Sequence, residues 1–236
     1  MSLMRPASVA SRQLVYELVS GGSGLVLALF MWGHMILVGS ILTGEIGFDW
    51  MAVQLEVYFI AQPTVVAIFA LFLVHAVMAA RKIPAQLEQR RQLLKLSKDL
   101  KSEEHVESLL WIWQVRTGMI VLVLGSFHLV LLGVDVLTPL FGERLGIEAS
   151  TSLARVQAGL WLPYAILLVS VEFHASVGLY RLAVKWGLFS RLGRETLKRI
   201  EQVILWVFLG LGALILLVLA GVVPPPLAFL LTGTGA

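Results

Sequence analysis

Two things are scarce in this sequence of 236 residues: it contains no cysteine, and only 14% of its residues are charged. The absence of cysteine excludes disulfides, thiolate zinc sites, iron–sulfur clusters bound by this chain, and haem attached through a C-x-x-C-H motif. Any metal must therefore be held by histidine, methionine or a carboxylate. No secretory signal peptide is evident, because the first apolar run is followed by Gly-Glu-Ile-Gly rather than by a small-residue cleavage site.

The shortage of charge accompanies an excess of apolar residues. Hydrophobic residues make up 58% of the chain and the mean hydropathy is +0.87, whereas ordinary globular domains are about 45–50% apolar and about 25% charged. This composition excludes a soluble domain and a disordered chain, and it predicts an integral membrane protein. The isoelectric point of about 9.4 would suit nucleic-acid binding, but the net charge is only +3. No nucleic-acid partner is expected.

Five long apolar runs account for most of the chain. Each can cross a hydrocarbon core of about 30 Å as a helix that rises about 1.5 Å per residue. The runs are too long for barrel strands, and backbone groups in lipid must bond within their own segment, so helices are expected. The sequence therefore predicts an all-α polytopic membrane protein, a single transmembrane domain over residues 1–236, with helices at about 24–42, 58–80, 109–136, 156–185 and 200–223.

The basic residues predict how the helices are oriented. Sixteen of the 18 lysines and arginines lie on one side of the expected membrane, and only Arg144 and Arg155 lie on the other. Positive residues gather on the cytoplasmic side, so the N-terminus is expected there and, after five crossings, the C-terminus in the periplasm. The connection 83–108 is then a cytoplasmic loop whose leucines suggest an amphipathic helix. It either lies on the lipid headgroups or docks a cytoplasmic subunit.

Four of the five histidines fall in four different apolar runs, where ionisable residues are costly and usually functional. The fifth, His105, lies among glutamates in the cytoplasmic loop, where a solvated role is expected. Counted along the helices, His75 and His174 each lie about 10 Å from the cytoplasmic edge, while His34 and His128 lie about 16 Å and about 10 Å from the outer edge. Two histidines at each of two levels suit two stacked haem b groups with axial imidazoles. Zinc or copper is less favoured, because such metals gather their ligands at one point.

Other polar residues near these levels suggest further roles. Lys185 and Arg155 lie at the cytoplasmic and outer edges, where haem propionates could emerge, and Trp111 is either a propionate donor or part of the interfacial aromatic belt. Glu172, the only acid deep in an apolar run, is interpreted either as a neutral acid bonded to a neighbouring helix or as a proton carrier along the redox centres. Glu56 is either a solvated acid at the rim or the acceptor of protons from an oxidised quinol.

Three segments around the histidines resemble a known family. The longest is EFHASVGLYRLAVKWG at residues 172–187, which is similar to the corresponding helix of the dihaem cytochrome b subunit of menaquinol:fumarate reductases. FMWGHM at residues 30–35, followed by GSILTG at 39–44, resembles the first helix of that subunit. WIWQ-x-x-TG at 111–118, followed by LGSFH at 124–128, resembles its third. The resemblance covers roughly residues 25–187.

The resemblance implies a bacterial inner-membrane anchor that passes electrons from menaquinol to a cytoplasmic iron–sulfur subunit and an FAD-containing flavoprotein subunit, where fumarate becomes succinate. A dimer of these heterotrimers is compatible with it. The proximal haem would be ligated by the second and fourth helices and the distal haem by the first and third, which is the pairing that the depth argument gives. The residues carried over are His75 and His174 (proximal), His34 and His128 (distal), Glu56 (quinol), Glu172 (proton transfer), and Trp111, Lys185 and, displaced by one position, Arg155 (propionates).

Three alternatives remain open from the residues. The same ligand set would serve the reverse reaction, as a succinate:menaquinone reductase. The cytochrome b anchor of a hydrogenase or formate dehydrogenase would also hold two haems, although the segment 172–187 argues against it. A proton-coupled transporter with histidine relays would contain no haem, and its substrate site would need polar groups near the midplane beyond the single carboxylate of Glu172.

Overall fold

The computed structural model describes residues 7–81, 106–141 and 146–232, and all regular structure in these ranges is helical. Five segments are long and apolar enough to cross a membrane, which confirms the predicted number of spans. Four of the five are composite, because a 3₁₀ or π turn joins or extends their helices; in the fifth span this is the 3₁₀ turn Ser190–Leu192 that precedes its helix. The spans are α1 (Ala7–Gly39, extended by a 3₁₀ turn Ser40–Thr43), α3 (Ala61–Ala80), α5 (Val106–Ile120) joined by a π segment (Val121–Gly125) to α6 (Ser126–Leu137), α7 (Ala149–Arg155) joined by a π segment (Val156–Leu160) to α8 (Trp161–Trp186), and α9 (Gly193–Leu219).

Large apolar side chains cover the outside of the bundle. Ile36 on α1, Val123 in the first π segment and Trp206 on α9 have 69%, 65% and 67% of their surface exposed. Water-soluble proteins rarely leave large contiguous apolar patches exposed, whereas lipid-facing helices do so throughout. The exposed apolar surface is therefore the lipid-facing surface of a membrane bundle.

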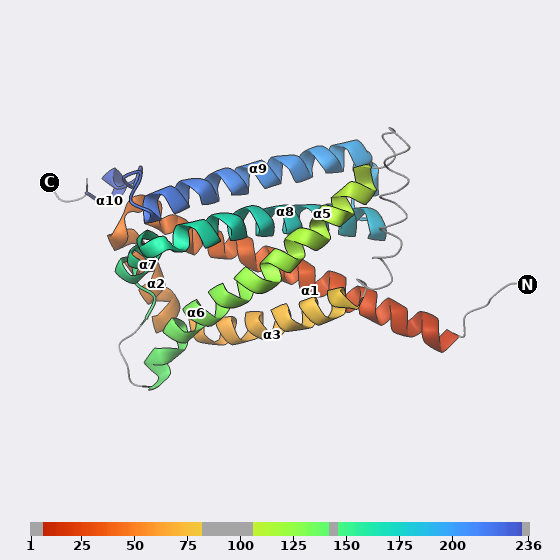
Figure 1. Cartoon of the computed structure of the whole chain (residues 1–236), viewed down its shortest axis with the longest axis horizontal. Helices are drawn as coiled ribbons and strands as arrows, with labels where there is room; N and C mark the ends of the chain where they lie inside the picture. Colours follow the sequence, from red (N-terminus) through yellow and green to blue (C-terminus); the bar gives the residue numbers. More distant parts are fainter. Residues whose placement is uncertain (1–6, 82–105, 142–145, 233–236) are drawn as a thin grey trace, which may run out of the picture.

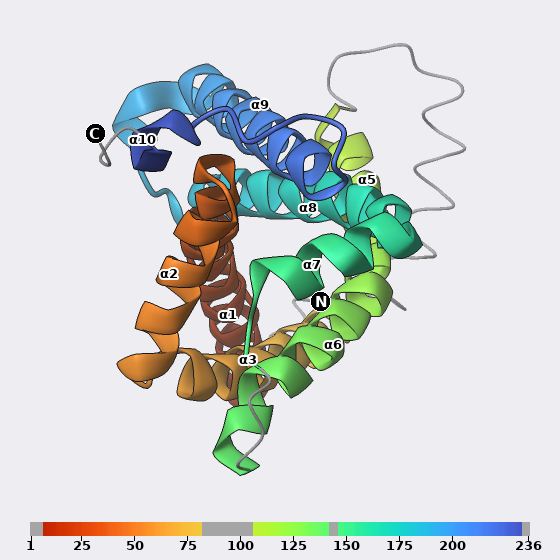
Figure 2. The ribbon, with the colours of Figure 1, turned by 90° about the vertical axis from the view of Figure 1, so that its left-hand side faces the viewer.

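Four of the spans close into a ring. Contacts run from α1 to α3, from α3 to α6, from α5 to α8, and from α8 back to α1, while α9 packs outside the ring against α8 and α1. Figure 1 shows the spans side by side along the long axis of the molecule, and Figure 2 shows the ring end-on. The ring matters for function because each of its four spans carries one of the four histidines expected in the membrane.

Two short helices lie at one end of the ring, which we call the α2 end. They are α2 (Glu45–Val57) and α7, and Figure 2 is viewed from this end. A buried apolar cluster joins them to the ends of α1 and α9; it consists of Ile41, Leu42, Phe48, Ala149, Val156, Ile215, Val218 and Leu219. The α2 end is therefore a packed cap. The short α10 (Phe229–Thr232) follows α9 at the same end.

The helix bounds differ from the expected ones, because an apolar run marks only the stretch of a helix that lies in lipid. The first helix begins at Ala7 instead of residue 24, the fourth span begins at Ala149 instead of 156, and α9 occupies 193–219 instead of 200–223. The run expected at 58–80 begins at Ala61, and α2 precedes it as a separate helix. Most of the expected amphipathic loop 83–108, His105 included, lies outside the described residues.

Two glycines lie where the regular helical backbone is interrupted. Gly44, between the 3₁₀ turn and α2, has φ +99°, and Gly159, inside the second π segment, has φ +119°. Both values are strained for residues with a side chain, so glycine permits the chain to turn into α2 and to bend between α7 and α8. The first π segment lies directly before the turn of α6 that carries His128, and single π turns inside helices are often found at functional sites.

Candidate functional site

The four membrane histidines meet in two pairs inside the ring. The ring centres of His75 on α3 and His174 on α8 are 6.3 Å apart, and those of His34 on α1 and His128 on α6 are 6.0 Å apart. The His34–His128 pair lies nearer the α2 end of the bundle, because His34 precedes the end of α1 by few residues and α6 runs towards that end. The structure thus brings together the same partners that the depth argument pairs.

The His75–His174 pair is oriented by hydrogen bonds to its Nδ1 atoms. The Nδ1 of His174 lies 2.8 Å from the backbone oxygen of Gln114, and the Nδ1 of His75 lies 3.1 Å from both the backbone oxygen of Ser20 and the hydroxyl of Ser23. A carbonyl acceptor requires a proton on Nδ1, which makes Nε2 the nitrogen suited to bind a metal. These hydrogen bonds therefore favour the tautomer with the proton on Nδ1 in both rings of this pair.

The His34–His128 pair is held by ring contacts. The ring of His34 stacks on that of Phe30 with ring centres 5.9 Å apart, and the rings of His128 and Tyr164 are nearly perpendicular with centres 5.5 Å apart. The Nδ1 of His128 is buried and has no hydrogen-bond partner among the described residues. Tyr164 is a site residue that the sequence analysis missed, since only the tertiary structure brings it to His128.

Glycines lie directly against the rings of the first pair. A Cβ on Gly118 would lie 2.7 Å from Cε1 of His174, and a Cβ on Gly24 would lie 2.9 Å from Cε1 of His75. Real Cβ contacts are not this short, so any larger residue would displace the ring. The sequence analysis did not identify these glycines, because each belongs to a different helix from the histidine that it contacts.

A cavity of about 1120 Å³ runs through the ring and is lined by all four histidines. Sites for a single drug-sized molecule are usually about 300–1,000 Å³. Two metal–imidazole bonds of about 2 Å, with about 1 Å from each nitrogen to its ring centre, put the ring centres of two axial ligands about 6 Å apart. The observed separations, the large apolar cavity, the unpartnered Nδ1 of His128 and the oriented rings of His75 and His174 therefore fit two stacked bis-histidine haems.

A small metal ion fits this arrangement less well. Within the described ranges, no three histidine or acidic side chains gather closely enough to hold a metal ion at one point. Structural zinc sites bind four ligands and catalytic ones three. The histidines are instead distributed as two separate pairs, which suits a planar cofactor that occupies the four equatorial positions itself.

Two cationic residues border the cavity, one towards each end, and each is paired with an acid. Lys185 forms an ion pair with Glu17, and Arg155 forms one with Asp135 at 2.5 Å. Trp111 also lines the cavity and is partly buried. All three residues expected at haem propionates thus lie on the cavity, and the acids that pair with the two cations are additional residues which the sequence analysis did not identify.

Glu172 is fully buried on α8 and borders the same cavity. Neither of its carboxyl oxygens has a hydrogen-bond partner among the described residues. A charged, unpaired carboxylate in this setting would be very costly, so the neutral acid is the expected form. No hydrogen bond from Glu172 to a neighbouring helix is found among the described residues.

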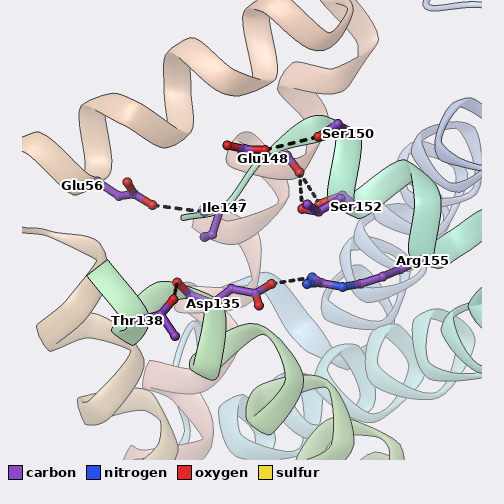
Figure 3. A network of polar contacts seen from close by, with 9 residues as sticks. Glu56, Asp135, Thr138, Ile147, Glu148, Ser150, Ser152 and Arg155 are labelled. Carbon is purple, nitrogen blue, oxygen red and sulfur yellow. Dashed lines mark hydrogen bonds and ion pairs between the residues drawn. The ribbon is translucent and has the colours of Figure 1, made fainter. Parts of the chain in front are cut away.

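Glu56 lies at the end of α2 and contacts the chain that enters α7. Its Oε1 accepts a hydrogen bond from the backbone N–H of Ile147 at 3.1 Å, and Figure 3 shows this contact beside the Asp135–Arg155 ion pair. The side chain of Glu56 is partly buried. It is close to the α2 end of the cavity, where Leu55 and Ile147 belong to the cavity wall.

The comparisons with known proteins identify the family. The family model described as "Succinate dehydrogenase/Fumarate reductase transmembrane subunit" matches residues 86–217, more than half of the chain. The chain belongs to this family. The expected resemblance is thereby confirmed, and within the family the five spans are those of a membrane subunit.

Similar relatives are named fumarate reductase cytochrome b subunit. The protein of Wolinella succinogenes is 39% identical over 175 residues, which cover 71% of this chain and 64% of the relative. The protein of Helicobacter pylori strain J99 is 33% identical over 204 residues, which cover 83% of this chain and 76% of the relative. The match therefore spans just under two thirds of the Wolinella protein and about three quarters of the Helicobacter one.

Proposed function

We propose that this chain is the dihaem cytochrome b membrane subunit of a quinol:fumarate reductase. His75 and His174 would hold the proximal haem b, and His34 and His128 the distal one. The observation that carries the proposal is the presence of two histidine pairs, with ring centres 6.3 Å and 6.0 Å apart, in one apolar cavity. The relatives named as cytochrome b subunits support haem b as the occupant.

The orientation and partners belong to the same proposal. The five spans would form a single transmembrane domain in a bacterial inner membrane, with the N-terminus and the proximal pair towards the cytoplasm and the α2 end towards the periplasm. An iron–sulfur subunit and a flavoprotein subunit would dock on the cytoplasmic side, and the complex could pair into a dimer of heterotrimers. The names of the relatives, which refer to fumarate reductase, favour this direction over succinate oxidation.

When bound at both levels, haem b would supply two one-electron carriers between membrane menaquinol and the soluble subunits. The chain's own residues would hold and orient these groups and manage the protons. Lys185 and Trp111 would face the proximal propionates and Arg155 the distal ones, where a cation or N–H donor stabilises a carboxylate. Glu56 would accept protons from menaquinol at the periplasmic rim.

Glu172 would transfer protons through the membrane in step with the electrons. Electrons that move inward from a periplasmic quinol site would build up charge across the membrane at about 2.3 kcal/mol per charge per 100 mV. A proton carried inward through Glu172 for each electron would cancel that charge. Turnover would then be close to electroneutral, and the buried, unpartnered carboxyl beside the cavity supports this role.

The proposal is tested first at the quinol site. In the purified complex, Glu56→Gln should lower fumarate reduction by a menaquinol analogue by about 100-fold, because general-base catalysis contributes about 10²–10⁴-fold. Haem content and fumarate reduction by reduced viologen, which enters at the soluble subunits, should stay at the wild-type level. A variant that oxidises the quinol analogue at the wild-type rate would contradict the role of Glu56.

The glycine that contacts His174 offers a second test. Gly118→Ala should displace the His174 ring and weaken retention of the proximal haem by about 10–100-fold, the usual effect of disturbing the support of a metal ligand. Gly210→Ala on α9 is the matched control, since a Cβ there meets nothing within 4 Å. Haem quantitation of both variants gives the answer, and equal haem content would refute the assigned contact.

A further inference from the structure

The connection between α6 and α7 is fastened to α2 by two carboxylates. The Oδ1 of Asp49 accepts a hydrogen bond from the backbone N–H of Ala149 at 2.7 Å, and the Oε1 of Glu56 accepts one from Ile147 at 3.1 Å. Asp49 and Glu56 are seven residues apart, which is about two helical turns, so both lie on one face of α2. Each is a charge-assisted bond to a backbone amide, the stronger kind of hydrogen bond.

Glycine at position 146 lets the Glu56 carboxylate lie against the backbone. A Cβ on Gly146 would be 2.5 Å from Oε1 and 2.8 Å from Oε2 of Glu56. A side chain at this position would therefore displace the Glu56 carboxylate from its place against the backbone.

The hydrogen bond between Asp49 and Ala149 lies beside buried residues of the α2 end. Ala149 is 0% exposed, and Phe48 and Ala52, beside Asp49 on α2, are 3% and 1% exposed. A buried backbone amide that loses its acceptor costs about 1–3 kcal/mol, so Asp49 fixes the position of Ala149 relative to α2. Ile147 is only two residues before Ala149, and its amide is held in place by the same attachment.

We propose that Gly146 and the amide of Ile147 form a seat for the Glu56 carboxylate, and that Asp49 is the positioning residue that holds this seat through Ala149. The inference rests on the proposed function of Glu56 in quinol oxidation. Because Oε1 is bonded to the amide of Ile147, Oε2 is the oxygen that receives the proton. The quinol O–H bond breaks, the proton goes to Oε2, and the electron pair of that bond stays on the oxygen of the resulting quinolate. The electrons of the quinolate would then pass one at a time to the haems of the proposed function.

The sharpest test is Gly146→Ala in the assembled membrane complex. The new Cβ meets the far end of a flexible side chain, so it displaces the carboxylate without changing its chemistry and with little effect on the fold. A displacement of about 1 Å can slow a reaction by about 100-fold. We expect the kcat for oxidation of a menaquinol analogue to fall at least tenfold, while the KM changes less than threefold, with normal haem spectra and viologen-driven fumarate reduction.

Asp49 is tested by a pair of variants. Asp49→Ala should lower the same kcat at least threefold, and Asp49→Asn, whose side-chain oxygen can still accept from Ala149, should restore most of it. The matched control is Glu148→Ala, which removes an exposed carboxylate of the same segment; among the described residues, its side chain accepts a hydrogen bond from the hydroxyl of Ser150 at 3.3 Å. This control should behave like the wild type.

These variants distinguish a failure of the proposed seat from a failure of the proposed role of Glu56 in quinol oxidation. If Glu56→Gln itself leaves quinol oxidation unchanged, the proposed role of Glu56 fails. If Glu56→Gln lowers the rate but Gly146→Ala and Asp49→Ala do not, the seat is refuted and the function stands. Haem quantitation identifies a variant that fails to assemble, and in that case the Asp49→Ala and Asp49→Asn pair decides the question.

Discussion

Replacement of His174 by alanine is expected to remove one of the two haems and to slow menaquinol-driven fumarate reduction by at least about 100-fold. Loss of residues that only support a metal ligand already costs about 10–100-fold, and His174 is the proposed ligand itself. The substitution also removes the donor that faces the backbone oxygen of Gln114 at 2.8 Å. Reduced-minus-oxidised spectra of the purified complex measure the haem, and a coupled quinol assay measures the rate.

Two controls accompany this prediction. Fumarate reduction by reduced viologen should persist in His174→Ala, which shows that the soluble subunits are still attached and active. His105→Ala changes the remaining histidine of the sequence, which is expected in a solvated loop, and it should keep both haems and the full rate. Two haems and a normal quinol rate in His174→Ala would mean that His174 is not an axial ligand.

Glu172→Gln is expected to keep both haems and yet lose at least about nine tenths of quinol-driven turnover. Glutamine has nearly the same shape as the acid but cannot carry a proton, and general acid–base groups contribute about 10²–10⁴-fold. Because Glu172 is fully buried and makes no hydrogen bond among the described residues, the substitution breaks no observed contact. The rate is measured in proteoliposomes, where uncompensated charge transfer would oppose turnover.

The matched control is Glu201→Gln on α9. Glu201 is also a buried acid in a membrane span, only 5% exposed, but it pairs with Lys198 at 2.7 Å and does not border the cavity. This variant should turn over like the wild type. Normal haem content together with unimpaired quinol turnover in Glu172→Gln would remove the support for proton transfer by this residue.

The sequence predicted the spans and the histidine pairs because both follow from one-dimensional rules. A membrane helix needs a long apolar run, and the depth of a residue follows from its distance to the charged edge. The five spans are confirmed by the structure. His75 and His174, and likewise His34 and His128, lie side by side as the depth argument requires, although their roles as haem ligands stay predictions.

The remaining parts of the site depend on contacts between distant residues. Glu56 meets Ile147 across 91 positions of the chain, and Asp49 meets Ala149 across 100. The glycines that contact the histidine rings belong to other helices, and the acid that pairs with Lys185 is 168 positions away. No apolar run, spacing or charge pattern encodes such partners, so the sequence predicted candidate site residues but not the residues that contact them.

The bounds of the helices were missed for a different reason. Hydropathy detects only the lipid-embedded part of a helix, so it overlooked the start of α1 at Ala7 and the separate helix α2. The π segment before α8 contains a residue with non-helical backbone angles, Gly159 with φ +119°, and a second π segment precedes α6. These local departures from regular helix have no hydropathy signature.

The most direct test of the account is pyridine haemochrome quantitation of the purified membrane complex. The two histidine pairs in one cavity predict two b-type haems per chain, and the visible spectrum of the reduced complex should show both. A count of one haem per chain would contradict the proposal that both histidine pairs bind haem. The absence of haem from a correctly folded protein would contradict the electron-transfer function and leave a proton-coupled transporter as the interpretation of the four histidines.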